Sequence, residues 1–161
     1  MFRPLHTATA SLGAAPYFAT LAKRAGVAAH QPRLYVFSGV SGHLARAGVD
    51  QLATELGLRV HRIDLSRVTG RFIGETEKTL ARAFAAALSR NAILFFDEAD
   101  AIFGKRSEVR EAHDRYANGE VAYLLQRLEV YAGAAALATR SPTPPRLSLK
   151  RRSVIVTRWP P

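Results

Sequence analysis

Cysteine is absent from the 161-residue sequence, which excludes disulfides and thiolate metal sites but leaves the cellular compartment undecided. No run of about 18 apolar residues occurs, so the sequence predicts no membrane-spanning helix, and we expect a cytoplasmic protein without a membrane partner. Aromatic residues make up only 9% of the chain, but apolar residues reach 48%, which is enough for one globular domain with a real core.

Acidic residues are missing from both ends of the sequence. Residues 1–49 hold five Lys or Arg and residues 140–161 hold six, whereas residues 50–139 carry 12 bases and all 13 acids. The net charge of +10 therefore belongs to the ends and not to the centre. Basic ends occur in nucleic-acid-binding proteins, but solvated terminal segments give the same pattern, and we favour the second interpretation.

Short apolar stretches alternate with helical patterns through the centre of the chain. Four stretches predict strands, at residues 34–38, 59–65, 92–96 and 134–139. Apolar residues at helical spacing predict helices at residues 50–57, 76–90 and 120–131. This alternation is typical of an α/β fold, a three-layer αβα sandwich around a parallel sheet, in which ligands bind at the carboxyl ends of the strands.

Proline is concentrated at the end of the sequence, where five of the eight prolines follow residue 141. Only residues 154–156 have the character of a strand there. We expect a basic amino-terminal segment at 1–32, a core at 33–139 and a disordered proline- and arginine-rich tail at 140–161, because prolines and unopposed charge both disfavour packing.

An acidic pair follows the third predicted strand. Four apolar residues at 93–96 run directly into Asp97 and Glu98. One carboxylate in this position can hold Mg²⁺ through its water shell, and its neighbour can polarise an attacking water. We therefore predict that both carboxylates are catalytic and that Asp97 also holds the metal. Asp100, further along, has the character of a loop or capping residue.

The segment GVSGHLAR, residues 39–46, follows the first predicted strand, where a phosphate-binding loop of the form G-x-x-x-x-G-K-[ST] would lie. Gly39 and Gly42 are present in this segment, so part of a phosphate-binding backbone cradle can form. The nucleotide-binding residues that we predict are Gly39, Ser41, Gly42, His43 and Arg46. The last three positions of the pattern hold Leu44, Ala45 and Arg46 instead.

From about residue 39 to residue 139 the sequence resembles the core of AAA+ ATPases of the bacterial kind. The motif ILFFDEAD, which contains Asp97 and Glu98, resembles the family's Walker B motif. The segment RIDLSRVTGRFIGETEKTLARAF is similar to the one between the Walker motifs, and it places Phe72 at the family's pore-loop aromatic. The resemblance implies the P-loop NTPase fold of the AAA+ large subdomain in the 33–139 core. It also implies ATP and Mg²⁺ as cofactors, and hydrolysis that remodels a protein partner, in a homo-oligomer.

The sequence departs from the family at the positions that handle phosphate. Ala45 stands where the lysine of the Walker A segment would contact the β- and γ-phosphates, and Arg46 stands at the hydroxyl that would bind Mg²⁺. Arg140 replaces the asparagine that would orient the attacking water. We therefore expect ATP and Mg²⁺ to bind weakly. After residue 139 the resemblance ends, without arginine fingers, a fifth strand or a helical lid, so we expect a monomer.

Three hypotheses remain open on the sequence. The chain is an AAA+ ATPase subunit whose activity is impaired, or it is a degenerate, non-hydrolysing relative that acts as a binding subunit or has no function. The third is a basic nucleic-acid-binding protein, which only the charge at the ends favours, and we expect no nucleic-acid partner. The protein that is remodelled is not identified by any motif.

Overall fold

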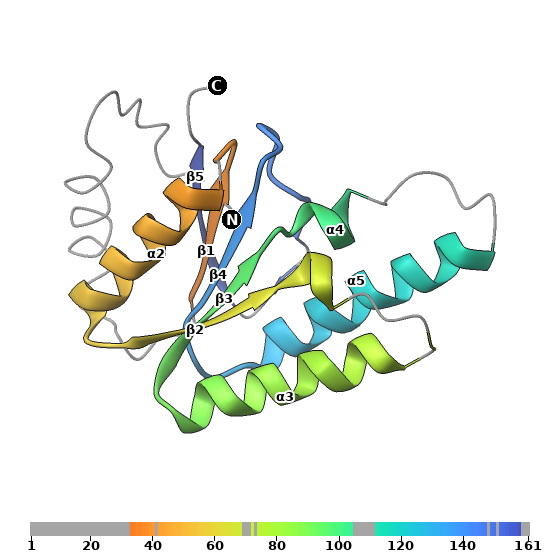
Figure 1. Ribbon diagram of the computed structural model, residues 1–161, viewed down its shortest axis with the longest axis horizontal. Coiled ribbons are helices and arrows are strands. Elements are labelled where there is room, and N and C mark those ends of the chain that lie inside the picture. Colours follow the sequence, from red (N-terminus) through yellow and green to blue (C-terminus); the bar gives the residue numbers. More distant parts are fainter. Residues whose placement is uncertain are drawn as a thin grey trace.

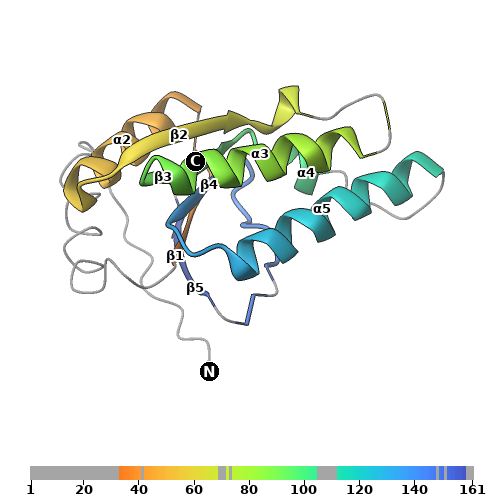
Figure 2. The ribbon, with the colours of Figure 1, turned by 90° about the horizontal axis from the view of Figure 1, so that it is seen from below.

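The computed structural model describes residues 33–40, 42–68, 72, 74–104, 112–147, 149–150 and 152–158. These residues form a central sheet that is covered by helices on both faces (Figures 1 and 2). The predicted three-layer α/β fold is therefore confirmed. None of the described helices has the length and apolar character that crossing a membrane requires.

Five strands make up the sheet, and all of its pairings are parallel. They are β1 (Arg33–Ser38), β2 (Arg59–Asp64), β3 (Ala92–Asp97), β4 (Ala135–Thr139) and β5 (Ser153–Arg158). Their order across the sheet is β2-β3-β4-β1-β5. Because all five strands run in the same direction, their carboxyl ends lie at one edge of the sheet. The predicted site residues follow β1, β3 and β4 at this edge.

The helices lie between the strands along the chain. They are α2 (Gly42–Leu56), the short 3₁₀ helix η1 (Leu65–Arg67), α3 (Glu75–Ser89), α4 (Asp100–Phe103) and α5 (Ala112–Val130). Helix α2 begins eight residues earlier than the predicted start at residue 50. Residues of the expected phosphate-binding loop therefore belong to a helix.

Each face of the sheet has its own apolar cluster. Alternate residues of a strand point to opposite faces, so Tyr35 and Phe37 pack under α2, whereas Leu34 and Val36 pack against α3 and α5. Every residue of β3 is buried, as is typical of a central strand in a parallel sheet. The two clusters hold the carboxyl ends of β1, β3 and β4 in fixed relative positions.

The tail differs from its sequence-based expectation. We expected residues 140–161 to be disordered and the fifth strand to be missing, but β5 pairs with β1 along all six residues of both strands. The reason is local: Val154, Ile155 and Val156 are β-branched residues, and the prolines at 142–145 fall in the connection, where no ladder hydrogen bonds are needed.

Arg152, immediately before β5, attaches the tail to the rest of the fold. Its side chain is 5% exposed, and its Nη1 donates to the carbonyls of Arg33 (3.2 Å) and Gly133 (3.0 Å), while Nη2 donates to the carbonyl of Tyr131. Burial lowers the pKa of this guanidinium below its ordinary value. A buried cation whose two Nη groups donate to three carbonyls fixes where β5 begins, although its Nε is buried without a hydrogen-bond partner among the described residues.

Candidate functional site

Asp97 ends β3 at the carboxyl edge of the sheet and is only 1% exposed. Its Oδ2 atom accepts a hydrogen bond from Nε of Arg46 on α2, at 3.1 Å. The same oxygen accepts from Arg62 on β2, through Nε at 3.0 Å and Nη2 at 2.7 Å. One carboxylate oxygen is therefore shared by two guanidinium groups.

The two arginines change what Asp97 can do. A carboxylate binds Mg²⁺ or its water shell with oxygen lone pairs, and those of Oδ2 point at positive charge here. Arg46 was predicted to bind nucleotide, but the structure places it on Asp97, at the position of the hydroxyl that the resemblance assigned to Mg²⁺. Oδ2 of Asp97 is thus paired with two guanidinium groups and is not free to bind a divalent metal while these contacts last.

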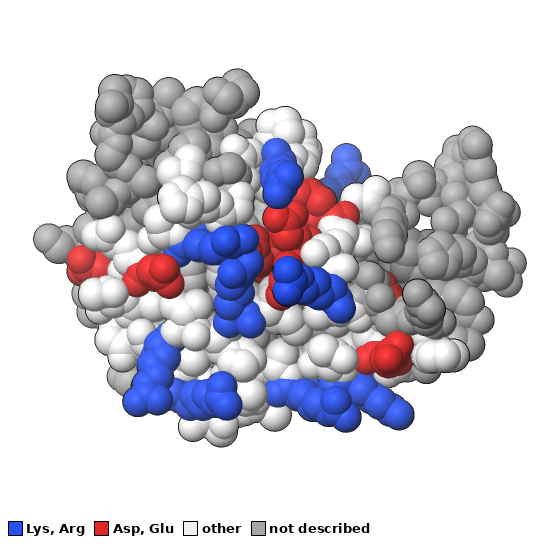
Figure 3. All heavy atoms as spheres, in the orientation of Figure 1, with Lys and Arg blue, Asp and Glu red and all other residues white. Residues whose placement is uncertain are grey.

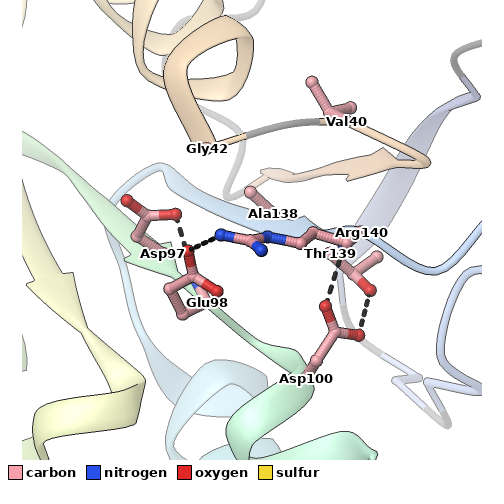
Figure 4. A pocket seen from close by; sticks show the side chains of 8 residues that line it. All are labelled: Val40, Gly42, Asp97, Glu98, Asp100, Ala138, Thr139 and Arg140. Carbon is pink, nitrogen blue, oxygen red and sulfur yellow. Dashed lines mark hydrogen bonds and ion pairs between the residues drawn. The ribbon is translucent and has the colours of Figure 1, made fainter.

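Glu98, the second predicted catalytic carboxylate, follows directly. It adopts a left-handed backbone conformation with φ of 54°, which is uncommon for a residue other than glycine, and its N–H donates to Oδ1 of Asp97 at 2.9 Å. Its Oε1 accepts from Nη2 of Arg140 at 2.9 Å (Figure 4). The residue in place of the family's asparagine therefore forms an ion pair with the carboxylate that would activate water.

Asp100 has a role that the sequence did not reveal. The Thr139 hydroxyl donates to Oδ1 of Asp100, and the Arg140 N–H donates to Oδ2 at 2.8 Å (Figure 4). The carboxylate thus fixes the end of β4 and with it the base of the Arg140 side chain. The sequence has no local signal for these contacts, because Thr139 and Arg140 lie 39 and 40 residues from Asp100.

The loop after β1 is bound to the end of β4. The N–H of Gly39, which has φ of 74°, donates to the carbonyl of Ser141 at 2.8 Å, and the Val40 N–H donates to that of Thr139 at 3.2 Å. Gly42 lies above both carboxylates, because a Cβ built on it would be 3.5 Å from Oε1 of Glu98 and 4.0 Å from Oδ1 of Asp97. The first two backbone donors of the loop are thus engaged within the protein.

The remaining predicted site residues lie apart from this cluster or outside the described residues. Ser41 falls outside them, His43 is exposed on the first turn of α2, and Phe72 is 76% exposed in the connection between η1 and α3. Ala45, at the position of the family's lysine, is fully buried in the apolar cluster under α2. The side chain of a lysine at position 45 would therefore begin in the buried apolar cluster and not at the site formed by Asp97 and Glu98.

The cavity between these groups is small. It comprises about 170 Å³ with its open side included and leaves no room for a water-sized molecule, so it is far smaller than the roughly 300–1,000 Å³ that is common for ligand pockets. Eight residues line it: Val40, Gly42, Asp97, Glu98, Asp100, Ala138, Thr139 and Arg140 (Figure 4). Among the described residues, no group of three or more His, Asp or Glu side chains is arranged to hold a metal ion.

Comparison with known protein families identifies the family to which this chain is similar. The model of the family described as "ATPase family associated with various cellular activities (AAA)" matches residues 47–156. The chain belongs to the AAA family. The match runs into β5, which corrects our expectation that the resemblance ends at residue 139, and it begins immediately after Arg46.

Two AAA-family relatives are similar to this chain. The "ATPase family gene 2 protein" of Schizosaccharomyces pombe is 36% identical over 105 residues, which cover 64% of this chain and 12% of the relative. The "Uncharacterized AAA family ATPase y4kL" of Sinorhizobium fredii is 32% identical over 79 residues, which cover 49% of this chain and 24% of the relative. The chain therefore spans a quarter or less of the length of either relative.

Proposed function

We propose that this chain is an AAA-family nucleotide-binding core in which ATP hydrolysis is impaired, so that it acts as a binding subunit. The observation that carries the proposal is the ion pair between Arg46 and Asp97, at 3.1 Å. The family binds ATP together with Mg²⁺, and in this chain the carboxylate that would hold the metal is paired with two cations.

Water activation is impaired for a second, independent reason. A general base has to present a free lone pair to the attacking water, and Oε1 of Glu98 accepts from Arg140 instead. This pair is more exposed, because the Arg140 side chain is 69% accessible against 46% for Arg46, so it breaks more readily than the Arg46–Asp97 pair, whose carboxylate is buried. The Arg46–Asp97 pair is thus the stronger obstacle to turnover.

The phosphate contacts are weakened as well. A charge-assisted hydrogen bond contributes about 1.5–3 kcal/mol, so the loss of the lysine at position 45 costs roughly 10- to 150-fold in affinity. We expect ATP to bind with a Kd at or above about 100 μM, which corresponds to roughly −5.5 kcal/mol. The family's usual function would then reduce, in this chain, to contacts with a partner protein without a cycle of hydrolysis.

ATP turnover by the full chain in the presence of Mg²⁺ tests the proposal. We expect the wild type to be as inactive as Glu98→Gln, which removes the base and serves as the matched control. We also expect the double variant Arg46→Thr, Arg140→Asn to bind Mg·ATP at least tenfold more tightly, because both obstructing guanidinium groups are gone. Turnover of the wild type well above that of Glu98→Gln would refute the proposal and favour an active ATPase subunit.

A further inference from the structure

A second, wider hollow lies beside Asp97, at the carboxyl end of β2. It is an open depression with about 500 Å³ of space, within the size range of small-ligand sites, and is lined by Arg46 from α2, Arg62 and Asp64 from β2, and Arg67 from η1. Figure 3 shows Lys and Arg side chains around the acidic side chains at the centre of this face. Three guanidinium groups therefore meet at one opening.

The ion pairs at the hollow leave donors that a ligand can use. Arg46 contacts Asp97 through Nε, and Arg67 contacts Asp64 through Nε at 3.4 Å, so neither pair uses the two Nη groups of its arginine. Arg62 uses Nε and Nη2 on Asp97, and its Nη1 is outside that contact. The terminal amino groups of a guanidinium are the part that binds phosphate oxygens in pairs.

The charge of the hollow favours an anion. The three arginines face two carboxylates, Asp64 and Asp97, which leaves one net positive charge before any ligand binds. A hydrogen bond from the Ser66 hydroxyl lowers the pKa of Asp64, so this residue stays ionised and keeps Arg67 at the rim. The fixed carboxylates hold the arginines in place, and the surplus charge attracts the ligand.

We propose that this hollow binds a diphosphate group, free or at the end of a nucleotide, without a metal ion. Three guanidinium groups match the several oxygens of a diphosphate better than those of a single phosphate, and they supply the positive charge that Mg²⁺ would otherwise bring. The inference rests on the proposed function in one respect, because Arg46 then binds phosphate from the position that obstructs the metal. An extended nucleic-acid backbone fits less well, since Asp64 and Asp97 flank the arginines and repel its further phosphates.

Calorimetric titration of the full chain with inorganic pyrophosphate, in EDTA, tests the proposal. We expect saturable binding that weakens at high salt and weakens again when excess Mg²⁺ chelates the ligand. Arg67→Gln should weaken binding at least tenfold, and because this side chain is 86% exposed the variant should fold normally, as its thermal unfolding will show. Arg82→Gln, an exposed site on α3 with the same change of charge, is the matched control and should bind like the wild type.

Three results with pyrophosphate would overturn the proposal. They are the absence of binding by the wild type at millimolar pyrophosphate, an unchanged affinity of Arg67→Gln, and an equal loss in Arg82→Gln, which would indicate only diffuse charge. Single-stranded DNA that binds more tightly than pyrophosphate, and is lost in Arg67→Gln, would also overturn it in favour of a nucleic-acid site. None of these measurements uses ATP turnover, so the proposal can fail while the proposed function stands, and the reverse.

Discussion

Removal of both arginines from Asp97 should cost much more stability than the two single removals together. The changes are Arg46→Met, Arg62→Met and the double variant, because methionine keeps most of the apolar stem but has no charge and no N–H donor. With either arginine present, the buried carboxylate still has a cation. With neither, the described part of the chain leaves it only the N–H of Glu98, at 2.9 Å.

The magnitudes follow from the geometry of the two pairs. The Arg46 side chain is 46% exposed and donates one hydrogen bond, so its loss should cost about 0.5–1 kcal/mol, as for partly exposed ion pairs. Arg62 is 38% exposed and makes two contacts, which gives about 1–1.5 kcal/mol. The double variant leaves an uncompensated buried charge and should lose about 3–5 kcal/mol, so the coupling is about 2 kcal/mol.

Urea unfolding followed by circular dichroism measures all four proteins of this cycle. The same cycle on an Asp97→Asn background is the control, and its coupling should vanish because no buried charge remains to be left unpaired. Millimolar MgCl₂ should raise the Tm of the double variant but not that of the wild type, since only a freed carboxylate can bind the metal. Additivity within about 0.5 kcal/mol in the wild-type background would refute the reasoning.

Three further predictions concern other parts of the fold. Arg152→Met should lower the free energy of unfolding, measured in urea, by about 3 kcal/mol, because three carbonyls lose their donor. A loss below about 1 kcal/mol would show that β5 does not depend on this residue. Ala45→Lys should lower the free energy of unfolding by at least about 2 kcal/mol in the same assay, because the charge enters a buried cluster, and Ala45→Ser is the milder control. A lysine variant as stable as the wild type would show that the lysine side chain reaches the site. Burial and then the charge of Arg90 lower the pKa of His61 below 6.5, so stability is full above pH 6.5 and falls as the pH drops through 6.5 towards the folded-state pKa. His61→Gln should remove that part of the pH dependence, and identical profiles for the two proteins would contradict it.

The sheet could be predicted from the sequence where apolar runs are unbroken. Strands β1 to β4 lie within one residue of their predicted bounds at every end. For β1, β3 and β4 the reason is their burial, which leaves a continuous apolar signal, whereas β2 is partly exposed and mixes polar with apolar residues. Helix α2 was predicted too short, although Ala45, Val49 and Leu52 already have helical spacing, because the segment before Asp50 was interpreted as a phosphate-binding loop. Strand β5 was missed because the prolines that precede it outweighed three β-branched residues.

The site could be predicted only in part. Asp97 and Glu98 were recognised from local sequence, because a carboxylate pair after a buried strand is a local pattern. Their arginine partners were not, because Arg46 lies 51 residues from Asp97 and Arg140 lies 42 residues from Glu98, and only tertiary structure brings them together. A signal was nevertheless present: two of the departures from the family pattern are arginines, and both occur at positions that face the acidic pair.

The position of β5 beside β1 also determines how the chain must fold. Arg152 and Arg33, which join the two strands at their starts, are 119 residues apart, so one edge of β1 stays without its partner until that whole length has been made. At roughly 5–20 residues per second, the ribosome takes on the order of 6–24 s to do so. During this interval β1 presents unpaired backbone groups beside an apolar surface, which is the kind of intermediate that chaperones bind and that aggregates when they do not.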